Sequence, residues 1–366
     1  MRLVIATPLY PPEIGGPATY AKILEEGLPK LGIETVIVKF SDVRHLPHVI
    51  RHIVYAWRMH IATRHADVIL TLDMLSVGWP ALCANLFRRK PFVVKIVGDH
   101  IWEQGRQRFG ITEVLEKFPR FSFSWHPYLW FLRALQFSVV RAADRVIVPS
   151  EYLKKIITAW GIPVGKITVI YNAVPLENTG TVPDAVASLQ KPLVVSVGRL
   201  VPWKHFDGVI DAVAALRAKG ISASLAIVGS GPLRAEIEKY AREKLGDSCV
   251  VLGALSHTDT LAVMRSADAF VLNSSYEGLS HVLIEALALS VPIVATRVGG
   301  NGEVVTDGED GLLVPSGDTG VLTQALERVL TDAMLRESMR RHANTSAQRF
   351  SADAMLTTTA ELLKSV

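Results

Sequence analysis

Short runs rich in Val, Ile and Leu alternate with longer segments of helical period, and this alternation starts afresh in the second half of the chain. The apolar runs are 2–7, 35–40, 68–72, 92–97, 145–149, 167–170, 193–197, 224–228, 250–252, 269–273 and 293–295. Strands that alternate with helices predict a parallel sheet covered by helices on both faces. Two such series predict two doubly wound, Rossmann-like α/β domains that face each other across a cleft.

A stretch without clear periodicity separates the two series. Residues 173–191 contain Pro, Gly and polar residues, which is typical of a linker. The sequence therefore predicts an N-terminal α/β domain over 1–172 and a second α/β domain over 192–345. The last stretch, 346–366, has a helical pattern and predicts a C-terminal helix.

The composition is that of a globular protein, since about half of the 366 residues are apolar and a fifth are charged. Cys83 and Cys249 lie in different halves, so a disulfide scaffold is not indicated and a reducing cytoplasm is expected. The apolar run at the start is too short for a signal peptide. No apolar run reaches the ~18 residues that a spanning helix needs. The sequence thus predicts a cytoplasmic protein.

The first half of the chain is basic. Residues 1–180 carry 22 Lys and Arg against 14 Asp and Glu, which suggests an anionic partner such as a membrane surface or a phosphate-bearing acceptor. Residues 44–66 predict a basic amphipathic helix, which either lies on anionic lipid or is a solvated face. His48 and His52 are one helical turn apart and could hold a metal, but no third ligand is indicated.

Residues 104–141 combine arginines with the aromatic side chains of Trp125, Tyr128, Trp130, Phe131 and Phe137. Such a mixture suits a membrane interface, or a pocket for a lipid-linked or sugar acceptor. The alternative is that these aromatic residues cap the core of the first domain. No nucleic-acid-binding module is recognised, so nucleic acid is not an expected partner.

The stretch 274–318 predicts a nucleotide-binding site. Ser280 precedes an apolar helical run and is placed as its N-cap, and Glu277 and Glu285 flank the start of that helix. Unpaired N–H groups at a helix start suit a phosphate. A carboxylate further along can accept hydrogen bonds from two hydroxyls, such as those of a ribose. The alternative is two solvated glutamates on a surface.

Two further elements of the second half suit a diphosphate. The run 193–197 is followed by Gly198, Arg199 and Lys204, and two cations after a strand can hold a pyrophosphate, Arg bidentately and Lys as a point charge. Structural cations on a surface loop are the alternative. The run 224–228 leads into a G-x-G-P turn that contains Gly229 and Gly231.

In the first half, polar or glycine-rich loops follow two of the apolar runs. Gly15 and Gly16 precede a helix, which makes a phosphate-approach unit or an ordinary turn. Asp99 and His100 follow the run 92–97, at the strand end where ligands bind in open α/β sheets.

The stretch 274–318 resembles the donor-site signature of retaining family-four glycosyltransferases, also called glycosyl transferases group 1. The matching residues are Glu277, Gly278, Glu285, Ala286, Ala288, Pro292, Val294, Ala295, Thr296, Gly299, Gly300, Glu303, Val305, Gly308, Gly311, Leu313, Val314 and Asp318. Ser290 departs from the pattern, because the family usually has Gly at this position. The resemblance extends thinly over the N-terminal half and strongly over 193–318.

This resemblance implies a GT-B fold, a C-terminal helix that crosses back to the first domain, and sugar transfer from a nucleotide-sugar with retention of configuration. The implied catalytic residues are Arg199, Lys204, Glu277, and Asp99 or His100. The implied donor-binding residues are Gly15, Gly16, Gly198, Gly229, Gly231, Gly278, Leu279, Ser280 and Glu285. No D-x-D follows a strand, and no metal or other cofactor is expected.

The acceptor is expected to be a glycan, a glycolipid or a polyprenyl-linked precursor, with peripheral membrane association at the cytoplasmic face as one possibility. Three alternatives remain at this point. They are a nucleotide-sugar epimerase on the same fold, a sugar phosphorylase, and a non-catalytic nucleotide-sugar-binding subunit. The intact set Arg199, Lys204, Glu277 and Glu285 counts against the last of these.

Overall fold

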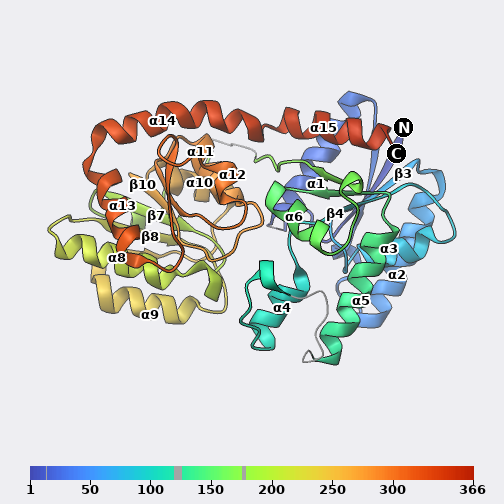
Figure 1. Cartoon of the computed structure of the whole chain (residues 1–366), viewed down its shortest axis with the longest axis horizontal. Helices are drawn as coiled ribbons and strands as arrows, with labels where there is room; N and C mark the ends of the chain where they lie inside the picture. The colour runs from blue at the N-terminus through green and yellow to red at the C-terminus, as the bar shows by residue number, and fades with distance from the viewer. Residues whose placement is uncertain (14, 119–125, 175–178) are drawn as a thin grey trace. The chain divides into compact units, whose positions relative to one another are not determined.

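The computed structural model describes residues 1–366 except 14, 119–125 and 175–178 (Figure 1). The chain divides into two compact units. The first comprises Met1–Ala173 together with Ser351–Val366, and the second comprises Val174–Phe350. Each unit is built around one six-stranded sheet whose paired strands are all parallel. Two doubly wound α/β domains were predicted, and the two sheets confirm that prediction.

The sheet of the first unit has the strand order β2-β1-β3-β4-β5-β6. Its strands are β1 (Arg2–Thr7), β2 (Glu34–Lys39), β3 (Val68–Thr71), β4 (Phe92–Lys95), β5 (Arg145–Val148) and β6 (Ile167–Val169). Its helices are α1 (Gly16–Gly27), α2 (His48–Ala62), α3 (Gly78–Asn85), α4 (His100–Arg108), α5 (Pro127–Ala142), α6 (Glu151–Ala159) and α15 (Ala352–Lys364). The order reverses between β1 and β3, as in flavodoxin-like sheets.

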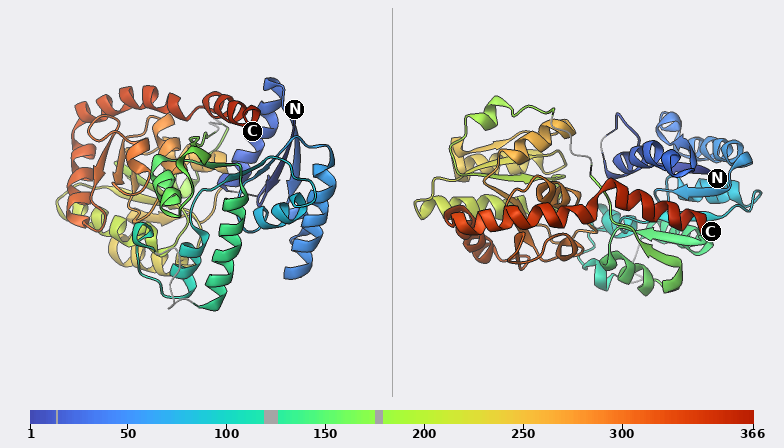
Figure 2. Two further views of the ribbon diagram at one scale, coloured as in Figure 1. Left: turned by 45° about the vertical axis from the view of Figure 1, so that its right-hand side comes forward. Right: turned by 90° about the horizontal axis from the view of Figure 1, so that it is seen from above.

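Alternation along the strands gives this sheet two apolar faces. Leu3 and Ile5 of β1 point into a core cluster that includes α1 and α15, and the intervening Val4 is equally buried on the other face. Helix α15 lies against α1 (Figures 1 and 2). Helix α3 contacts α2 on one side and α5 on the other.

The sheet of the second unit has the strand order β12-β11-β10-β7-β8-β9. Its strands are β7 (Leu193–Val197), β8 (Ser224–Val228), β9 (Cys249–Val251), β10 (Ala269–Leu272), β11 (Ile293–Thr296) and β12 (Gly311–Val314). Its helices are α7 (Asp184–Ala187), α8 (Phe206–Ala218), α9 (Arg234–Leu245), α10 (His257–Arg265), α11 (His281–Ala288), α12 (Asn301–Val304), α13 (Thr319–Thr331) and α14 (Ala333–Ala347). Counted along the unit, this is the 3-2-1-4-5-6 order of dinucleotide-binding folds.

Helices also cover both faces of the second sheet. Helix α8 packs between α9 and α13 over a core that includes Val194, Leu225 and Val271, whereas α11 contacts α10 and α12. The stretch expected to be a linker, 173–191, contains α7, and Thr181 N donates a hydrogen bond to Asp259 Oδ1 at 2.9 Å. From Val174 on, this stretch belongs to the second unit.

Candidate active site

The strand order of the second sheet reverses between β7 and β10. These two strands are neighbours, but β7 continues into α8 and β10 leads to α11, and the two helices belong to different groups of packed helices. At such a switch point the loops after the two strands diverge, and ligands of open α/β sheets bind there. The loops are 198–205 and 273–280. They contain Arg199, Lys204, Glu277 and Ser280 of the predicted site.

Direct hydrogen bonds join the two loops. Asn273 Nδ2 donates to the carbonyl of His205 at 3.1 Å, and the backbone N–H of Ser275 donates to the carbonyl of Trp203 at 2.8 Å. Lys204 is the last residue of a short 3₁₀ turn, Pro202–Lys204. The hydrogen bonds therefore hold the side chain of Lys204 beside the loop that carries Glu277.

Lys204 and Glu277 form an ion pair between Nζ and Oε1, and the Oγ of Ser274 donates to the same carboxylate oxygen at 2.6 Å. The two charged side chains are 13% and 12% exposed. A pair that is partly shielded from water interacts more strongly than a surface pair, and it still has access to a ligand. Ser274 and Lys204 thus fix the carboxylate of Glu277 at the switch point.

Glycine allows the surrounding backbone to approach these loops. A Cβ at Gly299, where φ is +52°, would lie 1.8 Å from the carbonyl oxygen of Glu277. A Cβ at Gly229 would lie equally close to the carbonyl oxygen of Gly198. No side chain fits at either position, so both glycines are required for the close packing of backbone at the strand ends.

Helix α11 starts at this site. Ser280 is its N-cap residue, as predicted, but its side chain accepts no capping hydrogen bond. In the part of the chain that the structure describes, the Ser280 hydroxyl is buried without a hydrogen-bond partner. The helix start therefore offers an uncommitted hydroxyl beside the backbone N–H groups of its first turn.

Glu285 lies on the same helix and is only 7% exposed. Its Oε1 lies 2.9 Å from Nε2 of His257, the first residue of α10. The imidazole orients one oxygen of the carboxylate. Glu285 is thus a positioned carboxylate rather than the solvated surface residue of the alternative interpretation.

The remaining predicted residues of the second unit line the same strand ends. Gly198 and the exposed Arg199 follow β7, and Gly229 and Gly231 follow β8. A Cβ at Gly231 would approach the carbonyl oxygen of Leu200 to 2.3 Å, so the two loops are in close contact. Gly278 and Leu279 are buried directly before the N-cap of α11. The structure therefore brings the predicted residues of this unit to one edge of one sheet.

The four predicted residues of the first unit lie at the corresponding edge of its own sheet. Gly15 is the N-cap of α1, and Gly16 is the first residue of that helix. Asp99 is the N-cap of α4, and its Oδ1 accepts hydrogen bonds from the backbone N–H groups of Ile101 and Trp102. Its Oδ2 accepts a hydrogen bond of 2.8 Å from Nη1 of Arg133.

This buried ion pair separates the two candidates that follow β4. Arg133 and Asp99 are 0% and 1% exposed, and both oxygens of Asp99 are engaged. Asp99 therefore supports the fold of this loop. His100 is exposed and lines a cavity of about 150 Å³ together with Asp73, Ser76 and Glu103.

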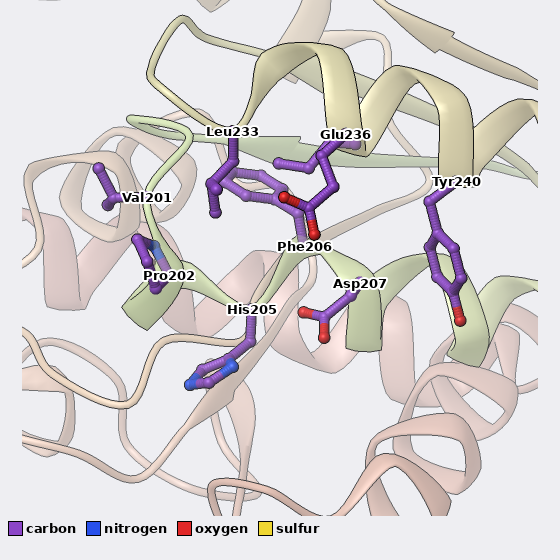
Figure 3. A pocket seen from close by; sticks show the side chains of 9 residues that line it. Val201, Pro202, His205, Phe206, Asp207, Leu233, Glu236 and Tyr240 are labelled. Carbon is purple, nitrogen blue, oxygen red and sulfur yellow. The ribbon is translucent and has the colours of Figure 1, made fainter. Parts of the chain in front are cut away.

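Two contacts and one cavity were not predicted from the sequence. His257 lies 28 residues before Glu285, and no local motif indicates that they meet. Ser274 was part of the stretch that was singled out, but no role was assigned to it. A cavity of about 570 Å³ opens where α8 begins beside α9 (Figure 3). It is lined by Val201, Pro202, His205, Phe206, Asp207, Leu233, Glu236, Ile237 and Tyr240.

The possible metal ligands of α2 have other contacts. Nδ1 of His48 lies 2.7 Å from Nη2 of Arg51, and His52 packs against the ring of Phe40. Among the described residues, no group of three or more His, Cys, Asp or Glu side chains is arranged to hold a metal ion. Within the same residues, no helix combines the length and apolar character needed to span a bilayer.

The aromatic residues of 104–141 have different environments. Phe137 is buried against Trp160, with ring centroids 5.7 Å apart, so this residue caps the core. Tyr128 and Phe131 are exposed on α5, and Trp130 is half-buried. Trp125 lies outside the described residues.

Two family models match the chain in succession. The model described as Glycosyltransferase Family 4 matches residues 14–178, and the model described as Glycosyl transferases group 1 matches residues 182–346. One relative from Campylobacter jejuni is N-acetylgalactosamine-N,N'-diacetylbacillosaminyl-diphospho-undecaprenol 4-alpha-N-acetylgalactosaminyltransferase. It is 32% identical over 290 residues, which are 77% of this chain and 78% of the relative. The chain belongs to the family-four glycosyltransferases.

Some other relatives match this chain over shorter stretches. The alpha-D-kanosaminyltransferase of Streptomyces kanamyceticus is 34% identical over 154 residues, which are 42% of this chain and 40% of the relative. The match covers 50% and 56% of the length of two further relatives. The chain therefore spans about half the length of these three proteins. The solved structure of Anabaena HepE in complex with UDP-glucose matches the full length of both chains. The TM-score is 0.77 and the identity 19%, a likeness that concerns the GT-B fold.

Proposed function

We propose that this protein transfers a sugar from a nucleoside-diphosphate sugar to a hydroxyl of an acceptor, with retention of the anomeric configuration. The observation that carries the proposal is the arrangement of side chains at the switch point between β7 and β10 of the second sheet. Lys204, Glu277 and Ser274 form one hydrogen-bonded group there, beside the uncapped start of α11. Family membership supports the same reaction class.

The diphosphate of the donor would be held by positive groups. Lys204 supplies a point charge, Arg199 supplies a planar guanidinium, and the start of α11 supplies backbone N–H groups and the positive end of the helix dipole. The buried hydroxyl of Ser280 supplies one more donor. As the bond to the sugar breaks, negative charge grows on the departing diphosphate, and groups fixed in advance stabilise that charge. The proposal therefore assigns this stabilisation to side chains and backbone and includes no metal.

The two glutamates would contact other parts of the donor. Glu277, oriented by Ser274 and Lys204, would accept hydrogen bonds from hydroxyls of the transferred sugar. Glu285, oriented by His257, would accept hydrogen bonds from the ribose hydroxyls. Both carboxylates have one oxygen engaged by the protein, so each is fixed in orientation before the donor binds. For the first unit we propose that the loop of Gly15 and Gly16 binds phosphate and that His100, which is exposed, takes part in catalysis.

For the acceptor we propose a glycan, a glycolipid or a polyprenyl-linked precursor of a cell-envelope glycan, reached at the cytoplasmic face of a membrane. The name of the Campylobacter jejuni relative specifies a diphospho-undecaprenol acceptor, and the structure of Anabaena HepE was solved with UDP-glucose. These names support a lipid-linked acceptor and a nucleotide-sugar donor as the first candidates to test.

The experiment is thermal unfolding with a panel of nucleoside diphosphates and nucleotide-sugars, each with and without EDTA. A ligand that binds the folded state at 100 times its Kd stabilises it by about 2.7 kcal/mol. We expect one base to raise the Tm in both conditions, and the shift to disappear in Glu285→Ala. The matched control is Glu327→Ala, which removes an exposed carboxylate from the same unit and keeps the shift.

The contradicting outcomes are distinct. If the protein unfolds cooperatively and no nucleotide or nucleotide-sugar raises its Tm, the proposed donor site is wrong. A shift that EDTA abolishes would overturn the metal-independent part of the proposal. Release of an isomerised free sugar without any acceptor would replace the transferase by an epimerase.

A further inference from the structure

The outward side of α2 is apolar although its inward side already contributes to the core. Tyr55 and Met59 are fully buried beneath the helix. The exposed apolar side chains of the same helix are Val49, Ile50, Ile53, Trp57 and Ile61. At 100° per residue they fall within roughly 120° of the helix circumference, so they form one stripe. Val49 is 72% exposed and Trp57 is 63% exposed, which leaves the stripe uncovered in this chain.

The stripe continues onto the end of α3. Trp57 and His60 of α2 line a shallow cavity of about 370 Å³ together with Cys83 and Phe87. The rings of His60 and Phe87 meet edge-on with centroids 6.1 Å apart, and Phe87 is 82% exposed. Leu86 beside it is also exposed. The α2–α3 patch is the name used below for these exposed residues, Val49, Ile50, Ile53, Trp57, Ile61, Leu86 and Phe87.

The two chain segments that carry the α2–α3 patch hold charges of one sign. Neither 43–66 nor 74–98 contains an Asp or Glu. The cations of these two segments are Arg44, Arg51, Arg58, Arg64, Arg88, Arg89, Lys90 and Lys95. Carboxylates from outside pair with two of them, Asp42 with Arg58 and Glu13 with Arg44, and Lys95 is buried. Arg51, Arg64, Arg88, Arg89 and Lys90 therefore leave the rim of the patch strongly positive.

A basic hollow adjoins the end of α3. Arg88 connects it to α2, since its Nη2 lies 2.9 Å from Nε2 of His60. The next two residues, Arg89 and Lys90, line a hollow of about 450 Å³ with Arg145, Lys166 and Asp144. Cationic side chains outnumber Asp144 in this hollow, which Ser365 and Val366 also line, and a mainly basic lining suits an anionic headgroup beside the apolar stripe.

We propose that the α2–α3 patch docks this protein on an anionic lipid bilayer, with the stripe in the interface and the surrounding cations among the headgroups. Exposed Trp and Ile on a helix whose polar side chains, apart from the buried Tyr55, are all Arg or His are typical of interfacial helices. A second copy of the chain fits less well, because a two-fold contact would place this positive rim against itself. The role of the bilayer as the source of a lipid-linked acceptor rests on the proposed function; the docking itself does not.

The test is flotation of the full chain, without donor, on vesicles of phosphatidylcholine alone and of phosphatidylcholine mixed with phosphatidylglycerol. We expect binding only to the anionic vesicles, weakened by added salt. The double variant Trp57→Ser/Phe87→Ser is expected to lower the vesicle-bound to free ratio at least tenfold. The matched control is Met334→Ser, which removes an apolar side chain that is 79% exposed in the second unit and keeps binding unchanged.

Several results would overturn the docking. Binding that is absent, equal on neutral vesicles, or unchanged in the double variant would each do so. A dimer in light scattering that the double variant dissociates would assign the patch to a second copy instead. The donor-induced thermal shift is measured on the same variants. Loss of vesicle binding with an intact shift counts against the docking alone, and a flat donor panel with intact vesicle binding counts against the donor site alone.

Discussion

Each of the two sheets has an ion pair near the end of a strand, and the two pairs differ in their surroundings. Lys204 and Glu277 of the second unit are 13% and 12% exposed, whereas Arg133 and Asp99 of the first unit are 0% and 1% exposed. The first of these pairs can meet a ligand, and the second has no surface through which to do so. Charged residues at a strand end therefore indicate a site only when the surrounding side chains leave them reachable.

The reason lies in the elements that supply the partners. Lys204 and Glu277 come from two loops that diverge at the switch point. Arg133 comes from the middle of α5, and its guanidinium lies over the rings of Phe118, Phe137 and Trp160 at 5.1 to 5.8 Å. Aromatic rings on several sides exclude water from the first-unit pair. Its charges therefore stabilise the loop after β4 rather than a ligand.

The largest expected effect is on the buried pair. Asp99→Ala removes the carboxylate that pairs with the buried guanidinium of Arg133, and we expect the free energy of unfolding to fall by about 3–5 kcal/mol. Urea unfolding measures this loss. The double variant Asp99→Ala/Arg133→Met is expected to recover most of it, because both charges of the buried pair are then removed. Unchanged unfolding together with lost turnover would give Asp99 a catalytic role and remove the contrast between the two pairs.

The second effect is on turnover. Lys204→Ala removes a cation from the proposed diphosphate site, and we expect the rate of donor cleavage to fall on the order of 10²-fold while unfolding changes by about 1 kcal/mol or less. Released nucleoside diphosphate measures the rate. The control is Lys219→Ala, which breaks the exposed pair with Glu327 in the same unit and leaves the rate unchanged. Equal rates for the two variants would contradict the assignment of Lys204.

A third prediction concerns Lys95, a charge that the first unit buries with no acidic partner among the described residues. In the described part of the chain its Nζ has no hydrogen bond and lies 3.8 Å from the ring centroid of Tyr20. Burial lowers the pKa of Lys95 from 10.5 to about 7. Between pH 7 and pH 10.5 Lys95 is protonated in the unfolded chain and neutral in the folded one. The free energy of unfolding therefore rises with pH across this window, and the destabilisation caused by burying Lys95 is greatest below pH 7.

Lys95→Met removes that cost. We expect the variant to be more stable than the parent by about 2–3 kcal/mol at pH 6. The difference between a pKa of 10.5 and one of about 7 corresponds to roughly 5 kcal/mol, and the contact of Lys95 with Tyr20 offsets about 2 kcal/mol of it. The advantage is expected to shrink towards pH 10. Urea unfolding of both proteins across this range measures it. A difference that does not change with pH would mean that Lys95 stays charged in the folded protein.

The sequence predicted the parts of the fold and site that depend on local pattern. Alternating apolar runs indicated the two α/β series, and the position of Ser280 before an apolar run indicated the start of α11. The sequence spacing could not show that Asp99 and Lys204 have different roles, because both are charged residues that follow a strand. The difference depends on Arg133, which lies 34 residues from Asp99 in sequence. The contact between His257 and Glu285 was missed for the same reason.

The smallest effect is expected at the other end of α11, where Ser290 stands at a position that usually has Gly in this family. Val291 N donates to the carbonyl of Ala286 and Ser290 N to that of Leu287, which is a Schellman motif, and it places Ser290 at φ +55°. A non-glycine residue in this conformation costs about 1 kcal/mol. Against this, Ser290 Oγ donates a hydrogen bond of 2.9 Å to Asn344 Oδ1 of α14.

Ser290→Gly relieves the strain and loses the exposed hydrogen bond, so we expect a gain of about 0.5 kcal/mol in the free energy of unfolding. Ser290→Ala keeps the strain and loses the same bond, so a loss of about 0.5–1 kcal/mol is expected. The difference in urea unfolding between the Gly and Ala variants measures the free energy of the left-handed backbone conformation, because both variants lack the hydrogen bond to Asn344. Equal stability of Gly and Ala at 290 would show that the left-handed conformation costs nothing here. A change in the donor-induced thermal shift would show that the end of α11, like its start, contributes to the ligand site.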